Sequence, residues 1–229
     1  MPVRHGVVAI VPAKDEAERI SSTVRAVAAL PHTMTVIVVD DGSADDTAAL
    51  AADAGAYVSR HPHTMGKATA MATGAQYAQQ LGYARSPVLF VDTDLEDSAG
   101  AITPIVEPVL EGAADLTIAN LPKQKTAGGG SGRVVRLARD GIEQATGRRV
   151  EQPLSGQRCL NPAALEASLP FASGWGVEVG MTIDVLNAGL RVEEVPVELH
   201  HRVTGTDLRA KLHRAAQFRD VWFALRRRR

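Results

Sequence analysis

The sequence predicts an α/β protein in a single domain, with a mostly parallel central sheet and helices on both faces. Over the first 120 residues, short apolar runs rich in β-branched residues alternate with segments of helical periodicity. Runs that are apolar throughout are typical of parallel strands buried on both faces. A length of 229 residues provides for one sizeable core, and no internal repeat or long linker divides the chain.

The first half of the chain supplies most of the expected sheet. We expect its strands at 6–12, 34–41, 56–60, 86–94 and 114–120. We expect its helices at 17–30, 43–55, 66–82 and 102–112. The second helix has the clearest boundaries, because Ser43 is a good N-cap and Gly55 a typical stop. The carboxyl ends of the strands then share one edge of the sheet, where open parallel sheets bind their ligands.

The pattern changes after Asn120. The stretch 121–135 is rich in glycine and lysine and has no periodicity, which indicates a loop. The segment 153–162 has no clear pattern and receives no assignment. In the rest of this half we expect helices at 134–146 and 178–188, a strand at 191–199 and a basic amphipathic segment at the C-terminus.

Composition limits the partners. The formal net charge is −1 and aromatic residues make up 4%, which argues against a nucleic-acid partner. Cys159 is the single cysteine, so no internal disulfide is expected and a cytoplasmic location is favoured. The C-terminal "FALRRRR" is either a solvated end or a basic tail that contacts an anionic membrane. Membrane association therefore stays open, as does a homodimer.

Two of the expected strands end in clustered carboxylates. Asp40 and Asp41 close the second strand, and Asp92 and Asp94 bracket a threonine at the end of the fourth. Such carboxylates repel one another unless a cation offsets them, and Mg²⁺ prefers one or two carboxylates together with phosphate oxygens. The pattern therefore predicts a site for a divalent cation that holds a diphosphate. The alternative is that these aspartates only form turns and helix caps.

Several motifs together resemble a known family. "IVPAKDEAERI", "VIVVDDGSADDT", "HTMGKATAMATG" and "VLFVDTDLED" follow in this order. They resemble the nucleotide-sugar half of a GT-A glycosyltransferase of the family 2 type. Later segments, among them "GGGSGRVVRLARDGI", "QPLSGQRCL" and "LPFASGWGVEVGMTIDVL", resemble the acceptor half of bacterial glucosyl-3-phosphoglycerate synthases. The resemblance implies a Rossmann-like GT-A fold in which 1–120 bind the nucleotide sugar and 121–229 bind the acceptor.

The resemblance also implies roles for residues of the first half. Lys67 would contact the diphosphate, and it is expected to be catalytic together with Asp94. The metal, Mg²⁺ or Mn²⁺, would be bound by Asp92, Asp94 and His201, with His200 as the alternative to His201. The residues expected at the nucleotide sugar are Pro12, Ala13, Asp15, Glu16, Asp40, Asp41, Ser43, Lys67, Asp92 and Thr93.

In the second half, the resemblance implies an acceptor site and a catalytic carboxylate. Glu178 would face the sugar or the acceptor and would serve as the base of an inverting reaction. Val135 stands where the phosphoglycerate enzymes have a threonine, which leaves polyprenyl phosphate or another anionic acceptor open. Arg158 has a structural ion pair as its alternative role. The residues expected at the acceptor are Gly132, Arg133, Ser155, Gly156, Arg158, Trp175 and Gly176, with Gln157 as part of the floor beside Arg158.

The sequence thus predicts a metal-dependent glycosyltransferase that moves a hexose to an anionic or hydroxyl acceptor, with UDP-glucose as the favoured donor. A membrane-docked polyprenyl-phosphate glycosyltransferase is one alternative. A nucleotidyltransferase would need a glycine-rich loop directly after the first strand, where "VPAKDEAERI" has no glycine. A non-catalytic nucleotide-sugar binder is disfavoured by the number of acidic groups at the strand ends. The acceptor, the nucleobase, the stereochemistry and the oligomeric state stay open.

Overall fold

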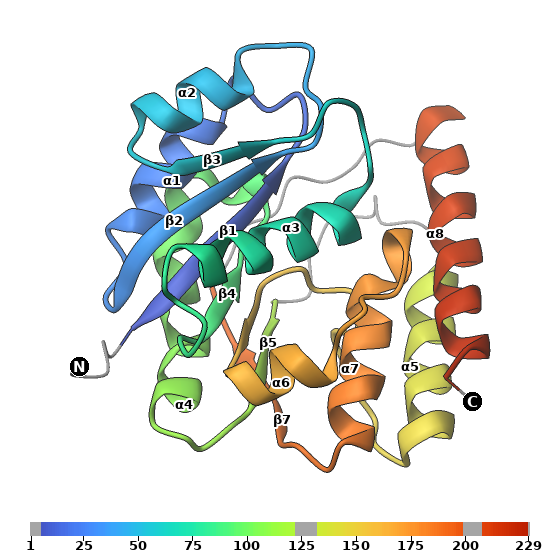
Figure 1. Cartoon of the computed structure of the whole chain (residues 1–229). Coiled ribbons are helices and arrows are strands. Elements are labelled where there is room, and N and C mark those ends of the chain that lie inside the picture. Colours follow the sequence, from blue (N-terminus) through green and yellow to red (C-terminus); the bar gives the residue numbers. More distant parts are fainter. Residues whose placement is uncertain (1–5, 122–131, 199–207, 229) are drawn as a thin grey trace.

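The computed structural model describes residues 6–121, 132–198 and 208–228, and the side chains of 94, 96–99 and 208–214 lie outside that description. Within it, the strands form one sheet in the order β3-β2-β1-β4-β6-β5-β7 (Figure 1). β6 runs antiparallel to β4 and β5, and the other neighbours are parallel. The strands are β1 (Val7–Ala13), β2 (Thr33–Asp40), β3 (Tyr57–Arg60), β4 (Val88–Phe90), β5 (Leu116–Asn120), β6 (Arg158–Leu160) and β7 (Val192–Pro196). The predicted, mostly parallel α/β sheet is confirmed.

β1 lies in the middle of the parallel part of the sheet and is buried on both faces. Successive side chains of a strand point to opposite faces, so Ile10 packs into one core cluster and Val11 into the other. The register pairs Ala13 of β1 with Asp40 of β2, and the backbone N–H of Val91 donates to the carbonyl of Ile10. The carboxyl ends of β1, β2 and β4 therefore reach the same edge of the sheet.

The helices divide between the two faces, as predicted. One core cluster contains side chains of α1 (Ile20–Ala28), α2 (Thr47–Asp53), the 3₁₀ segment η1 (Thr93–Ile105) and α4 (Glu107–Leu110). The other contains side chains of α3 (Lys67–Gln80), α5 (Arg133–Thr146), α6 (Pro162–Ala167), α7 (Val177–Asn187) and α8 (Leu208–Arg226). A short 3₁₀ turn, η2 (Gly174–Gly176), leads directly into α7.

Three parts of the chain differ from the expectation. The helix expected at 43–55 begins at Thr47, so Ser43 is not its N-cap and instead accepts a hydrogen bond from the N–H of Asp15. The unassigned segment 153–162 contains β6, whose length of 3 residues is too short to show a period, and α6 begins at its end. The fourth strand ends at Phe90, so the acidic stretch that follows it lies in η1 and not in a strand. The expected helix at 102–112 is divided between η1 and α4. Pro104 and Pro108 lie near this division, and proline supplies no backbone N–H for a continuous helix.

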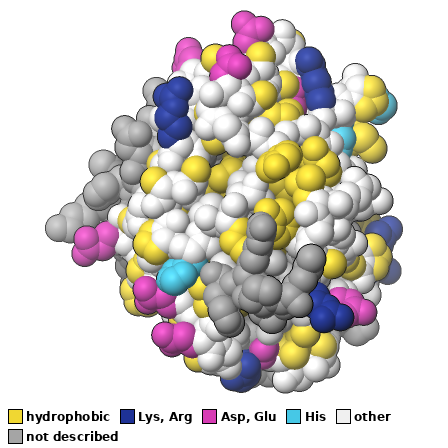
Figure 2. All heavy atoms as spheres, turned by 60° about the vertical axis from the view of Figure 1, so that its left-hand side comes forward, with side chains coloured by type: hydrophobic (Ala, Val, Ile, Leu, Met, Phe, Trp, Pro, Cys, Tyr) yellow, Lys and Arg dark blue, Asp and Glu magenta, His cyan; other side chains and the backbone are white. Residues whose placement is uncertain are grey.

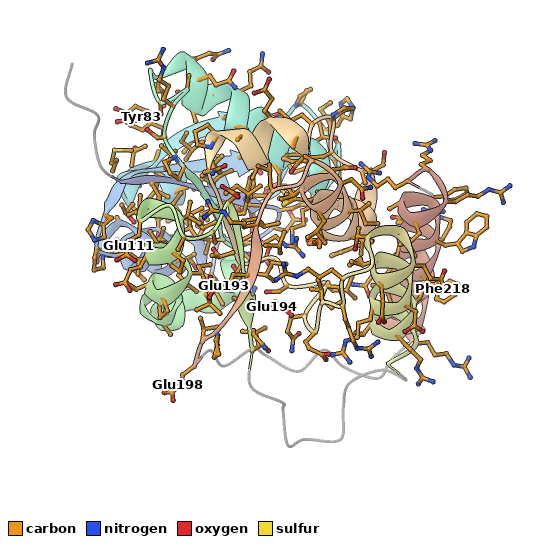
Figure 3. The ribbon with its side chains drawn as sticks, turned by 90° about the horizontal axis from the view of Figure 1, so that it is seen from below. Tyr83, Glu111, Glu193, Glu194, Glu198 and Phe218 are labelled. Atoms are coloured by element: carbon orange, nitrogen blue, oxygen red, sulfur yellow. The ribbon has the colours of Figure 1, made fainter. Side chains whose placement is uncertain are left out.

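The two predicted halves share this single sheet, because β6 of the second half lies between β4 and β5 of the first. The division of roles between 1–120 and 121–229 stays a prediction. In the view from below, Glu194 of β7 points toward the loop after α5 (Figure 3). There its carboxylate accepts hydrogen bonds from the backbone N–H groups of Glu151 (2.8 Å) and Gln152 (2.6 Å).

The surface shows no broad patch of one charge on the face drawn in Figure 2, where acidic and basic side chains are scattered around a band of hydrophobic ones. This agrees with the near-zero net charge. In the parts of the chain that the structure describes, no helix combines the length and the apolar character needed to cross a bilayer.

Candidate active site

A pocket of about 340 Å³ opens at the carboxyl ends of β1, β2 and β4. This is the edge where the sequence predicted a ligand site. Its lining residues come from these strand ends, from the start of α3 and from η2: Pro12, Ala13, Lys14, Glu16, Asp41, Thr64, Gly66, Lys67, Ala70, Asp92, Thr93, Gly174 and Trp175.

Lys67, the first residue of α3, joins two carboxylates at the pocket. Its Nζ lies 2.8 Å from Oδ1 of Asp92, which follows β4, and 2.9 Å from Oε1 of Glu178 near the start of α7. Burial alone would lower the pKa of the Lys67 ammonium, but the two carboxylates outweigh that effect and raise the pKa above its ordinary value. The site therefore holds a permanent positive charge between two acidic groups.

Asp41 fixes the loop that leads to Lys67. Its carboxylate accepts hydrogen bonds from the backbone N–H groups of Met65 (2.7 Å) and Gly66 (2.8 Å), and it lies 2.7 Å from Nδ1 of His61. Burial opposes ionisation of this carboxylate, yet the hydrogen bonds lower its pKa below the ordinary value. Gly66 adopts a φ of +93°, which favours glycine and lets the chain turn into α3.

His61 is a supporting residue that the sequence did not single out. Its second ring nitrogen, Nε2, lies 3.0 Å from Oγ1 of Thr73 on α3, so the ring connects the end of β2 to that helix. The stretch "RHPHTMGK" contains His61 and His63, and nothing in it indicates which ring faces Asp41.

Asp40, Asp15 and Ser43 were predicted at the nucleotide sugar, but none of them lines the pocket. Asp40 is fully buried and accepts a hydrogen bond from the N–H of Ser43 (2.9 Å), with Nε of Arg60 3.1 Å from its other oxygen. Asp15 donates its N–H to Ser43 Oγ (2.9 Å) and accepts from the N–H of Ala44 (2.8 Å). These contacts tie the loops after β1 and β2 together, which is the turn-forming role that the sequence left as the alternative.

Asp92 is supported from the second half of the chain. Gln157 donates its Nε2 to Oδ2 of Asp92 (3.1 Å), and its Oε1 accepts from the N–H of Asp92 (3.0 Å). A Cβ atom added at Gly156 would lie 2.1 Å from the same Oδ2, so only a glycine lets the backbone approach the carboxylate this closely. The resemblance placed Gly156 and Gln157 near the acceptor, and the structure brings both against Asp92.

Among the described residues, Arg158 is held inside the protein by hydrogen bonds, and not by the ion pair that stood as its alternative role. Its side chain is fully buried and donates to the carbonyls of Ser155 (2.8 Å) and Pro153 (2.9 Å) and to Oγ1 of Thr182 (2.8 Å). Burial lowers its pKa to about 10. With its donors directed into the protein, Arg158 does not line the pocket as an acceptor ligand would.

The other predicted residues take different positions. Trp175 lines the pocket, Gly176 is buried beneath α8, and Ser155 is buried with no hydrogen-bond partner for its Oγ among the described residues. Gly132 and Arg133 are exposed at the start of α5, outside the pocket lining.

The predicted metal site is described only in part. Of its members, Asp92 lies at the pocket, whereas the side chain of Asp94 and both His200 and His201 lie outside the described residues. Among the described side chains, no three metal-binding groups of His, Cys, Asp or Glu come together.

A comparison with protein families matches residues 8–161 to the model described as glycosyl transferase family 2. The glucosyl-3-phosphoglycerate synthase of Mycolicibacterium paratuberculosis is 31% identical over 195 residues, which are 78% of this chain and 59% of that protein. The glycosyltransferase AglJ of Haloferax volcanii is 28% identical over 214 residues, covering 90% of this chain and 67% of that protein. The chain thus spans about three fifths of the length of the synthases it matches.

Solved structures give the same result at the level of the fold. The glucosyl-3-phosphoglycerate synthase of Mycobacterium tuberculosis in complex with Mn²⁺, UDP and glucosyl-3-phosphoglycerate is 29% identical and superimposes with a TM-score of 0.76. The same enzyme with Mg²⁺ and UDP is 28% identical, with a TM-score of 0.75. In both cases the match covers 97% of this chain and 79% of the solved one. The match over two thirds of the sequence and the shared fold establish that this chain belongs to glycosyl transferase family 2.

Proposed function

We propose that this protein is a metal-dependent glycosyltransferase that moves glucose from UDP-glucose to an anionic acceptor. One observation carries the proposal: at the strand-end pocket of a family 2 chain, the ammonium of Lys67 lies between Asp92 and Glu178. The choice of UDP-glucose is supported by the relatives, since the synthase of Mycobacterium tuberculosis was solved with Mn²⁺ and UDP-glucose.

Lys67 has the properties of a ligand for the leaving diphosphate. Departure of a nucleoside diphosphate builds up negative charge, and a preorganised positive group stabilises that charge in the transition state. The raised pKa of Lys67 keeps it protonated at neutral pH. Lys67 also begins a helix of 14 residues, whose N-terminal N–H groups and dipole favour an anion at the same place.

Asp92 is the described residue that could hold a divalent cation. A carboxylate oxygen is the type of ligand that Mg²⁺ and Mn²⁺ prefer, and a bound cation would share this carboxylate with the Lys67 ammonium, which lies 2.8 Å from Oδ1. We propose Asp92 as one ligand, with Asp94 and His201 as the others and His200 as the alternative to His201. When bound, such a cation neutralises charge on the departing diphosphate.

Glu178 is our candidate for the group that contacts the transferred sugar or the acceptor hydroxyl. It is 3% exposed, and its Oε1 lies 2.9 Å from the Lys67 ammonium. A carboxylate can accept hydrogen bonds from the hydroxyl groups of a sugar or an acceptor. In an inverting reaction it would take the proton of the acceptor hydroxyl. In a retaining reaction it would position the sugar, and the stereochemistry stays open between these two roles.

The proposed acceptor is anionic because of the start of α5. Arg133 and Arg136 are exposed in the first turn of this helix of 14 residues, where the dipole also favours a negative group. The synthase of Mycobacterium tuberculosis was solved with phosphoglyceric acid, which supports a small phosphorylated acid as the first acceptor to test. Val135 stands where the phosphoglycerate enzymes have a threonine, so other anionic acceptors should be tested beside the phosphorylated acid.

A contact with an anionic membrane is a second proposal, and the outer side of α8 supports it. Phe218, Trp222 and Phe223 are 42%, 39% and 48% exposed, and exposed arginines lie at 219, 226 and 227. Phe218 projects from the outer side of the helix (Figure 3). Aromatic and basic side chains on one helix face are typical of proteins that bind lipid headgroups.

Calorimetry with UDP-glucose tests the main proposal. We expect binding that is at least about tenfold tighter with Mn²⁺ than without it, because Asp92 would help to hold a cation that offsets the charge of the diphosphate. GDP-mannose serves as the control for the nucleobase and the sugar. If neither nucleotide sugar binds more tightly with Mn²⁺ or Mg²⁺ present, the proposed function is wrong.

A further inference from the structure

We propose that Asp220 of the C-terminal helix α8 is a positioning residue for the wall of the pocket that Gly174 and Trp175 form. The identity of the pocket's ligand rests on the proposed function, whereas the contact between α8 and the wall does not. On this view α8 is part of the donor site, although none of its residues with a described side chain lines the pocket.

The carboxylate of Asp220 contacts the wall directly. Its Oδ2 accepts a hydrogen bond from the backbone N–H of Trp175 at 3.2 Å. Gly174 has a φ of +59°, and a Cβ atom added there would lie 2.1 Å from the same oxygen. The carboxylate therefore lies against the bare backbone of the turn and holds one of its peptide groups.

The second oxygen of Asp220 is also bound. Nε and a terminal nitrogen of Arg219 each lie 3.0 Å from Oδ1. Asp220 is the one acidic residue among the residues of α8, which otherwise carries several basic side chains. Its position on the inner side of the helix, at 16% side-chain exposure, fits the contact with η2.

The wall is continuous with a residue proposed for chemistry. Gly174 and Trp175 belong to η2, which runs without a break into α7, and Glu178 is the second residue of α7. The peptide group that Asp220 holds therefore lies three residues before the carboxylate that meets Lys67. A shift of this turn would move both a lining side chain and the start of the helix that carries Glu178.

The helix α8 is held tightly enough to act as a support. It packs beside α5 and α7 (Figure 1). A Cβ atom at Gly176 would lie 2.7 Å from the Cβ of Ala224, and one at Gly141 would lie 2.4 Å from the side chain of Leu225. At both places the close approach of α8 depends on a glycine.

A second ion pair holds the chain just after the end of α8 and provides a control. Arg228 shares its Nε–H between the two carboxylate oxygens of Asp184 on α7 (2.8 and 2.9 Å) and donates from a terminal nitrogen to the same carboxylate (2.6 Å). Neither residue lines the pocket. If Asp220 only anchored the helix, its loss should resemble the loss of Asp184.

Trp175 itself reports on the wall. The chain has 2 tryptophans, so Trp222→Phe leaves Trp175 as the single indole. In this background we compare Asp220→Ala with Asp184→Asn by acrylamide quenching without ligand. We expect quenching to rise about twofold in the first variant and to stay unchanged in the second, because only the first frees the peptide of Trp175.

Steady-state kinetics on the complete chain give the second readout. For Asp220→Ala we expect the KM for UDP-glucose to rise about tenfold while kcat changes less than about threefold, as for lost ground-state positioning. In Asp220→Asn the amide oxygen can still accept the hydrogen bond from Trp175, so the KM should stay close to that of the unmodified chain. Gly174→Ala adds a methyl group against the carboxylate and should also raise the KM, which keeps the test open if Asp220→Ala does not fold.

Two outcomes separate the proposals. If Asp220→Ala matches Asp184→Asn in quenching and in KM, Asp220 is only an anchor of the fold and our inference is overturned. If no nucleotide sugar binds to the unmodified chain, the proposed function fails, while the quenching comparison still decides whether Asp220 supports the wall.

Discussion

The Nζ of Lys67 lies 2.8 Å from Oδ1 of Asp92, and this contact joins the start of α3 to the end of β4 at the edge of the sheet. The same nitrogen lies 2.9 Å from Glu178, which is 111 residues away in the sequence. In the proposed function, the ammonium of Lys67 contacts the anionic leaving group, and the carboxylate of Asp92 holds the cation.

Asp92→Asn should abolish most of the activity. The substitution keeps the shape of the side chain but removes the charge that attracts a divalent cation, and it replaces one of the two accepting oxygens by an amide NH₂. We expect kcat/KM for glucose transfer to fall by about a hundredfold or more, with an unchanged circular dichroism spectrum. The exposed Asp53→Asn on α2 is the matched control. A variant at position 92 that keeps full activity with Mn²⁺ would remove Asp92 from the metal site.

Asp41 should make the stability of the protein sensitive to acid. Its pKa is lowered in the folded state, so its contribution is present above the ordinary value of 3.8 and is lost as the pH falls through the folded pKa. Asp41→Asn should therefore be less stable than the unmodified chain at pH 7 and should lose less stability between pH 4 and pH 2. Urea unfolding at each pH measures this, with the exposed Asp46→Asn as control. Parallel pH profiles for the chain and the Asp41 variant would contradict the assignment.

Arg158→Met should act on stability and not on acceptor binding. It removes three hydrogen bonds and leaves two buried carbonyls without their donor. We expect the free energy of unfolding to fall by about 2–4 kcal/mol. The exposed Arg136→Met should change the free energy of unfolding by less than about 0.5 kcal/mol. It should instead weaken the binding of an anionic acceptor. The reverse pattern, with a stable Arg158 variant and a raised acceptor KM, would restore Arg158 to the acceptor site.

Binding to anionic vesicles tests the outer side of α8. The chain should sediment with phosphatidylglycerol vesicles and not with phosphatidylcholine vesicles, because exposed arginines flank the aromatic side chains. Replacing Phe218, Trp222 and Phe223 together with serine should abolish the sedimentation, since little apolar surface then remains to insert. Equal binding by the triple variant, or none by the unmodified chain, would speak against a membrane contact through this helix.

The sequence predicts the sheet better than the site. β1 and β2 are evident because each is apolar on both faces, whereas β6 is too short to carry a period. Asp40 and Asp41 are neighbours of the same type, yet one forms a turn and the other organises the loop before Lys67. The register of β2 and the path of the following loop decide whether Asp40 or Asp41 faces the pocket. Neither the register nor the path can be predicted from the residue type.

Contacts between distant segments account for the rest. Glu178 reaches Lys67, Gln157 reaches Asp92, and Asp220 reaches Trp175 only after the sheet has formed and the helices have packed against it. The resemblance to the family indicated the first contact as a shared site. It placed Gln157 near the acceptor and not at Asp92, and it gave no indication of the contact that Asp220 makes.

Binding of UDP to Lys67→Met, measured by calorimetry with Mn²⁺ present, tests the central claim most directly. If the Lys67 ammonium holds the diphosphate, the dissociation constant should rise about tenfold to a hundredfold, and Lys67→Arg should recover part of the loss. Arg85→Met, which removes an exposed positive charge near the end of α3, should leave the constant unchanged. A folded Lys67→Met variant that binds UDP as tightly as the unmodified chain would contradict the account.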